Sequence, residues 1–135
     1  MTLVDTNVLL DVFTRDPQWL AWSLAQLEEA ALAGPLAIND VIYAETSTRY
    51  QNVDDFDAAL ATIGVTILPM SRIVLFVAGK AFTQYRRAGG IRTGVLSDFF
   101  VGAHAAVERL PLLTRDARRY RYYFPTVVSI TPESK

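Results

Sequence analysis

Apolar residues in this chain fall into short runs separated by longer amphipathic segments. Short runs bounded by polar or glycine residues are typical of buried strands, and here they are Leu3-Val4, Leu36 to Ile38, Val65 to Leu68, Leu112-Leu113 and Val127 to Ile130. The segments between them have helical spacing and predict helices at roughly 7–14, 18–33, 40–50, 53–62, 72–88, 98–109 and 117–121. This alternation favours an α/β fold with helices on both faces of a parallel sheet of about five strands.

Polar residues and glycines mark the expected ends of these helices. Asp16, Asn39 and Ser71 stand where N-caps are expected, and Gly34-Pro35, Gly64 and Gly89-Gly90 follow helical segments. The chain has 135 residues, 51% of them hydrophobic, which is enough for one core. We therefore expect a single domain over residues 1–130 and a frayed tail over 131–135.

The absence of cysteine narrows the chemistry. Without cysteine the chain has neither disulfides nor thiolate metal ligands, and His104 is its one histidine. Any bound ion must then rely on oxygen ligands and at most one imidazole, which favours Mg²⁺ or Mn²⁺ over zinc. The sequence begins without a basic or signal-like apolar stretch, and its longest apolar run, 73–79, is too short to span a bilayer. We expect a cytoplasmic protein that does not enter a membrane.

Charge is distributed unevenly between the two halves of the chain. Residues 1–71 hold ten acidic residues against two arginines, whereas residues 72–135 hold four acidic residues against eleven basic ones. The net charge of the whole chain is only −1. A basic half beside an acidic pocket suits a polyanionic substrate, although solvated helix faces explain any single arginine equally well.

Four acidic residues stand in apolar surroundings and form the candidate site: Asp5, Glu45, Asp98 and Asp116. Asp5 and Asp116 follow predicted strands, at the sheet edge where ligands gather in α/β folds. Asp98 stands at the predicted start of a helix, and Glu45 is spaced to share an apolar helix face with Val41 and Ile42. Converging carboxylates would repel one another without a cation. The set therefore predicts a metal site.

Each of these residues also has a simpler explanation. Asp5 or Thr6 could merely cap the following helix, and Asp116 could cap the segment after it. Asn7 and Asp11, four residues apart, would share a helix face near Asp5. Simple core packing is the favoured interpretation of the apolar surface around Trp19 and Trp22, although part of it could meet a partner.

His104 cannot supply the pair of general acid and base histidines used by many ribonucleases that attack through the 2′-hydroxyl group. It also lies about 120° around the helix from Asp98. A packed or partner-facing histidine is the better interpretation. A nucleophile-elbow serine and a glycine-rich phosphate loop are both absent from the sequence.

At these residues the chain resembles PIN-domain ribonucleases, and most closely the VapC-type toxins of type II toxin–antitoxin pairs. The resemblance covers nearly the whole chain, and its motifs are specific as an ordered set. They are Val4 to Asp11, Val41 to Glu45, Leu96 to Ala105, Leu112 to Asp116, Arg119-Tyr120 and Tyr123 to Pro125.

The resemblance implies a three-layer α/β/α sandwich and a magnesium-dependent endoribonuclease, with Mn²⁺ as a substitute ion. The catalytic residues would be Asp5, Glu45, Asp98 and Asp116; of these, Asp5, Asp98 and Asp116 would bind the metal. Asn7 and Thr114 would be supporting residues, while Asp11 carries over less securely. Metal-activated water would hydrolyse RNA, leaving a 5′-phosphate and a 3′-hydroxyl. The candidates for RNA backbone contacts are Arg86, Arg87, Arg92, Arg115 and Arg118.

The resemblance further implies a VapB-like antitoxin that occludes the acidic pocket, and a homodimer. The alternative is a catalytically idle PIN-like module that binds RNA or protein. A haloacid-dehalogenase-like phosphatase is disfavoured because Asn7 stands where its second aspartate belongs. A receiver domain is disfavoured because Lys80 and Lys135 are both misplaced for its lysine.

Overall fold

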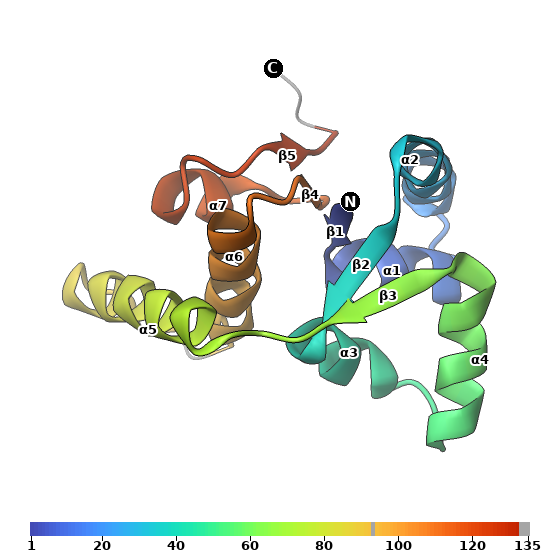
Figure 1. The fold of residues 1–135 in the computed structure, drawn as a ribbon, viewed down its shortest axis with the longest axis horizontal. Helices are drawn as coiled ribbons and strands as arrows, with labels where there is room; N and C mark the ends of the chain where they lie inside the picture. The colour runs from blue at the N-terminus through green and yellow to red at the C-terminus, as the bar shows by residue number, and fades with distance from the viewer. Residues whose placement is uncertain (93, 133–135) are drawn as a thin grey trace.

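The structure, a computed structural model, describes residues 1–92 and 94–132. Within these ranges strands and helices alternate along the chain (Figure 1). The strands are β1 (Thr2–Val4), β2 (Leu36–Asn39), β3 (Val65–Leu68), β4 (Leu112–Leu113) and β5 (Ser129–Ile130). The helices are α1 (Thr6–Phe13), α2 (Leu20–Ala33), α3 (Asp40–Ser47), α4 (Val53–Ile63), α5 (Arg72–Arg87), α6 (Leu96–Glu108) and α7 (Arg118–Tyr123).

The five strands form one parallel sheet in the order β3-β2-β1-β4-β5. β1 is central, and Leu3 lies between Ala37 of β2 and Leu112 of β4. All residues of β1 and β2 are buried, as expected of strands covered on both faces. Figure 1 shows α5, α6 and α7 grouped on one side of the strands, and α2 and α4 on the other. The predicted α/β fold with a five-stranded parallel sheet is confirmed.

Two of the three predicted N-caps are confirmed. Asn39 Oδ1 accepts a hydrogen bond from Ile42 N at 3.0 Å, and Ser71 Oγ accepts one from Val74 N at 3.3 Å. Asp16 was wrongly predicted to cap α2. Its Oδ1 accepts hydrogen bonds from the backbone of Gln18 and Trp19, in the turn before the helix.

The C-terminal strand is shorter than its apolar run predicts. Val127 N donates to Phe124 O at 3.0 Å, which closes a turn, so β5 begins only at Ser129. Thr131, which we assigned to the tail, is buried, and its hydroxyl donates to Arg115 O at 3.4 Å. Residues 133–135 of the predicted frayed tail lie outside the described ranges.

Helix α6 is the main helix of the core beside the sheet. Its buried residues include Phe99, Gly102 and His104. Gly102 allows close packing, because a Cβ atom there would overlap the ring of Phe124, which immediately follows α7. His104 is buried as a packed histidine, and its Nδ1 lies 3.1 Å from Asn39 Nδ2. These contacts fix α6 relative to α3 and α7, and so fix the place of Asp98 in its first turn.

Candidate active site

The candidate site forms where β1 and β4 end side by side. The parallel pairing places Asp5, just after β1, next to Thr114, just after β4. Asp5 N donates to Leu113 O at 2.9 Å, and Thr114 Oγ1 donates to Asp5 Oδ2 at 2.9 Å. Strand order therefore brings together two residues that are 109 positions apart in the sequence.

Asp5 is buried, with only 6% of its surface exposed. Its Oδ1 accepts a hydrogen bond from Thr6 N at 2.8 Å, so it does cap α1 as the simpler explanation proposed. Its Oδ2 accepts hydrogen bonds from Thr114 and from the Tyr120 hydroxyl, the latter at 2.8 Å. Burial, and secondarily the negative charge of Asp98, raise the pKa of Asp5 to about 6 despite these three hydrogen bonds. The carboxylate thus lacks sufficient compensating positive charge.

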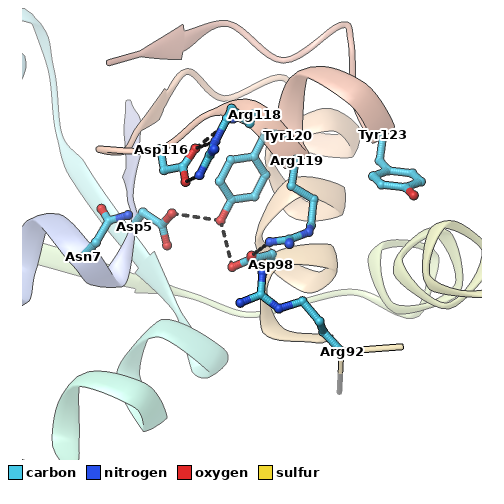
Figure 2. A pocket seen from close by; sticks show the side chains of 9 residues that line it. All are labelled: Asp5, Asn7, Arg92, Asp98, Asp116, Arg118, Arg119, Tyr120 and Tyr123. Carbon is cyan, nitrogen blue, oxygen red and sulfur yellow. Dashed lines mark hydrogen bonds and ion pairs between the residues drawn. The ribbon is translucent and has the colours of Figure 1, made fainter. Parts of the chain in front are cut away.

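Asp98 approaches from the first turn of α6. Its Oδ2 accepts a hydrogen bond from Arg119 Nη1 at 2.5 Å, and the Tyr120 hydroxyl lies 3.5 Å from its Oδ1. Burial raises the pKa of Asp98, and the Arg119 guanidinium opposes this shift. Figure 2 shows the Tyr120 hydroxyl between the carboxylates of Asp5 and Asp98, with the Arg119 guanidinium beside the Asp98 carboxylate.

Asp116 is turned toward Arg118 rather than toward the other two aspartates. Arg118 Nε and Nη2 donate to its two carboxylate oxygens at 3.0 and 2.8 Å. This pairing lowers the pKa of Asp116. The side chains are 49% and 78% exposed, so solvent screens the pair.

Glu45 is exposed, which contradicts the prediction that it lies on the buried face of its helix. Ile42 and Thr46 are the residues of α3 that face the core. Glu45 Oε1 accepts a hydrogen bond from Thr6 Oγ1 at 2.7 Å. Its negative charge also contributes to the raised pKa of Asp98, so Glu45 lies near the aspartates without being buried among them.

The two predicted supporting residues connect the strand ends. Asn7 Nδ2 donates to Thr114 Oγ1 at 3.3 Å, and Asn7 Oδ1 accepts from Arg115 N at 3.2 Å. Thr114 is fully buried and in turn donates to Asp5. Asn7 and Thr114 therefore fix the orientation of the Asp5 carboxylate from the β4 side.

Asp11 lies outside this arrangement. It is 2% exposed and accepts hydrogen bonds from Ser23 Oγ at 2.6 Å and from Arg115 Nε at 2.7 Å. The Arg115 guanidinium also lies over the Trp19 ring, 5.1 Å from its centroid. Asp11 and Arg115 thus fasten the segment after β4 to α1 and α2, a structural use of both residues that the sequence did not reveal.

A surface hollow of about 510 Å³ gathers most of the candidate residues. Of the five predicted RNA-binding arginines, Arg92 and Arg118 line it, whereas Arg86, Arg87 and Arg115 do not. The lining is formed by Asp5, Asn7, Arg92, Asp98, Asp116, Arg118, Arg119, Tyr120 and Tyr123 (Figure 2).

Sequence reasoning did not select Arg119 and Tyr120 as site residues. The available signals were their place three and four positions after Asp116 and their presence as the pair Arg119-Tyr120 among the motifs of the PIN resemblance. These signals were ambiguous, because the same residues fit a short solvated helix. Only the packing of α7 against α6 directs them to Asp5 and Asp98.

The carboxylates of the site can be matched to the ligand needs of a divalent cation. Over residues 1–92 and 94–132, no three acidic or histidine side chains are arranged so that they could hold a metal ion together. Asp5 and Asp98 do offer carboxylate oxygens beside the hollow, and Asp5 lacks balancing positive charge. Mg²⁺ is commonly bound by one or two carboxylates, with water and phosphate oxygens completing its shell. The residues fit Mg²⁺ in this mode.

Comparison with known proteins assigns the chain to a family. Residues 2–125 match the family model of the PIN domain. The chain belongs to the PIN domain family, as its motifs predicted. A search of the curated proteins found no match.

Solved structures share the fold at low sequence identity. A chain of VapBC2 from Rickettsia felis, bound to a promoter DNA fragment, is 18% identical with a TM-score of 0.73, covering 96% of this chain and 97% of that one. A chain of a toxin–antitoxin complex from Klebsiella pneumoniae is 24% identical with a TM-score of 0.63, covering 95% and 96%. FitAcB from Neisseria gonorrhoeae matches over the full length of both chains, with 19% identity and a TM-score of 0.69.

In the residues that the structure describes, none of the helices has both the length and the apolar character needed to cross a bilayer.

Proposed function

We propose that this protein is a Mg²⁺-dependent endoribonuclease. The observation that carries the proposal is the buried carboxylate of Asp5, which lies at the end of a central strand, faces Asp98 and borders a hollow lined by Arg92, Arg118 and Arg119. Carboxylate oxygens can bind a divalent cation, and the neighbouring arginines can bind the phosphates of a nucleic-acid backbone. The PIN family assignment supports nuclease chemistry at this site.

In the proposed reaction the side chains of the site bind and orient the ion and the RNA. Asp5 and Asp98 would hold the ion, and Asp116 would join them on leaving its pair with Arg118. Thr114 and Asn7 hold Asp5 in place, and the arginines of the hollow bind phosphate oxygens flanking the cleaved bond. The ion supplies an activated water and positive charge at the phosphate. Hydrolysis would join the water oxygen to phosphorus and break the bond to O3′; the water would lose a proton to Glu45, and O3′ would take one from solvent.

Glu45 would have a different role from the aspartates. It is exposed beside the aspartates and held by the Thr6 hydroxyl, which leaves its second carboxylate oxygen available for a water molecule. Glu45 does not line the hollow, but its charge is felt at Asp98, and a carboxylate near the ion ligands can orient the attacking water and accept its proton. Glu45 would thus act on water, whereas Asp5 and Asp98 act on the ion.

The deciding experiment measures RNA cleavage and cation binding together. Asp98→Asn should lower Mg²⁺-dependent cleavage of RNA by at least about 100-fold, because it removes an ion ligand. Asp54→Asn, an exposed first-turn aspartate of α4, is the matched control and should cleave at the wild-type rate. Circular dichroism should show that both variants are folded. Cleavage at the wild-type rate by a folded Asp98→Asn protein would refute the assignment.

We further propose that the enzyme is the toxin of a toxin–antitoxin pair and forms a homodimer in the cytoplasm. The support is the similarity of its fold to chains from VapBC and other toxin–antitoxin complexes. A VapB-like antitoxin would cover the hollow and oppose RNA entry. Co-expression with the product of the adjoining open reading frame should give a stable complex without nuclease activity, and sedimentation should show the oligomeric state.

An idle PIN-like binding module is the second candidate function. The observation in its favour is that Asp98 and Asp116 are paired with Arg119 and Arg118. Thermal unfolding separates the two candidates, because an ion bound only by the folded state raises the melting temperature. Stabilisation by millimolar Mn²⁺ favours the enzyme, and its absence favours the binding module.

A further inference from the structure

Three consecutive residues of α7 each bond to a different aspartate of the site. Arg118 pairs with Asp116, Arg119 pairs with Asp98, and the Tyr120 hydroxyl donates to Asp5. One short helix therefore contributes a charged or hydrogen-bonding partner to each of the three carboxylates, and Asp5 accepts further hydrogen bonds from Thr6 and Thr114. All six residues line the same hollow (Figure 2).

We propose that Arg119 is a counter-cation for Asp98. It pairs with the Asp98 carboxylate when no divalent ion is bound, and it moves to an RNA phosphate when the ion binds. The inference rests on the proposed nuclease function, and it concerns the order of events at the same site. Binding of the divalent ion would then prepare the site for its polyanionic substrate, because it would release Arg119 from Asp98 and leave the guanidinium free to bind a phosphate.

The Arg119 guanidinium and a divalent ion would compete for the negative charge of Asp98. Arg119 Nη1 already binds Asp98 Oδ2, and the Arg119 side chain is only 26% exposed, so water screens its charge incompletely. A divalent ion on the same carboxylate would lie within a few ångströms of the guanidinium and repel it. Arg119 also lines the hollow, so it can turn toward a bound phosphate while staying in the site. A guanidinium suits phosphate because it donates two parallel hydrogen bonds.

Tyr120 differs from Arg119 in this respect. The residue is 2% exposed, and its hydroxyl donates a hydrogen bond to Asp5 at 2.8 Å. The tyrosine carries no charge that would oppose an incoming ion, and the packing around it leaves little room to move. We therefore assign the movable contact to Arg119 and a fixed, positioning contact to Tyr120.

The test measures Mn²⁺ binding to the whole protein by calorimetry, without RNA. Arg119→Gln should bind Mn²⁺ about fivefold more tightly than wild type, because a competing charge is gone. Arg119→Lys keeps the charge and should stay within about twofold of wild type. Arg109→Gln removes an equal charge at the opposite end of α6 from Asp98 and should also change the affinity by less than about twofold.

Cleavage kinetics provide the second measurement. Arg119→Gln should need less Mg²⁺ for half-maximal activity while its KM for an RNA oligonucleotide rises, since the phosphate ligand is lost. If Arg119→Gln binds Mn²⁺ no more tightly than wild type, Arg119 merely positions Asp98 and the counter-cation proposal is wrong, while the nuclease proposal stands. If wild type itself binds no Mn²⁺ at millimolar concentration, the proposed function fails and the counter-cation role fails with it.

Discussion

Asn39 Nδ2 donates a hydrogen bond to His104 Nδ1 across 3.1 Å inside the protein, where the two residues are 0% and 1% exposed. Asn39 ends β2 and caps α3 through its Oδ1, and His104 lies in the middle of α6. The bond requires a neutral imidazole with Nδ1 as acceptor. It therefore joins the helix that carries Glu45 to the helix that carries Asp98.

This pair predicts acid sensitivity. Burial lowers the pKa of His104 below 6.5, although the charges of Glu108 and Asp40 oppose the shift. Because the folded-state pKa is the lower one, the stabilisation is complete above the unfolded value and is lost as pH falls through the folded value. Urea unfolding from about pH 7.5 to 5 should show falling stability for wild type, and a weaker pH dependence for His104→Gln. Equal slopes for the two proteins would contradict the assignment.

Gly102 should tolerate no side chain. A Cβ atom at this position would overlap the Phe124 ring, so Gly102→Ala must displace that buried ring. We expect a loss of about 1–3 kcal/mol in the free energy of unfolding, as for an overpacked core. Gly79→Ala on α5, where a Cβ atom meets open space, is the matched control and should be neutral or stabilising in chemical denaturation.

Asp5 should destabilise the protein when no cation is bound. Its pKa is raised to about 6, so its contribution to stability is full below the ordinary value of 3.8 and is lost as pH rises through 6. At about pH 8, Asp5→Asn should therefore melt at or above the wild-type temperature in EDTA. With millimolar Mg²⁺ only wild type should gain stability. A variant that melts lower in EDTA and still responds to Mg²⁺ would argue against a metal-binding Asp5.

Arg115 should matter for stability more than for RNA binding. Arg115→Ala leaves Asp11 buried without its ionic partner, a change that costs about 3 kcal/mol at comparable sites. Chemical denaturation should detect this loss. The double substitution Asp11→Asn with Arg115→Gln should recover part of it, because the uncompensated charge is gone. A stable Arg115→Ala protein would contradict the anchoring role.

Arg92 should matter for RNA binding more than for stability. It is exposed at the edge of the hollow, and its backbone N–H donates to the Tyr85 hydroxyl at 3.1 Å. Arg92→Gln should keep the fold and reduce the salt dependence of RNA affinity by about one counterion. Fluorescence anisotropy with an RNA oligonucleotide at several salt concentrations provides the measurement, and Arg86→Gln on α5, outside the hollow, is its control.

Periodicity and end signals in the sequence determined the strands, the helices and the caps at Asn39 and Ser71, because these depend on neighbours a few positions away. They also placed Asp5 and Asp116 just past strand ends, where a parallel sheet brings such residues together. Glu45 was misjudged, since two adjacent faces of a short helix are hard to separate by spacing alone. The pairing of Arg115 with Asp11, and of Arg119 and Tyr120 with Asp98 and Asp5, was decided only by the tertiary structure. These contacts join residues 21 to 115 positions apart, and strand order and helix packing, rather than local pattern, set which of them meet.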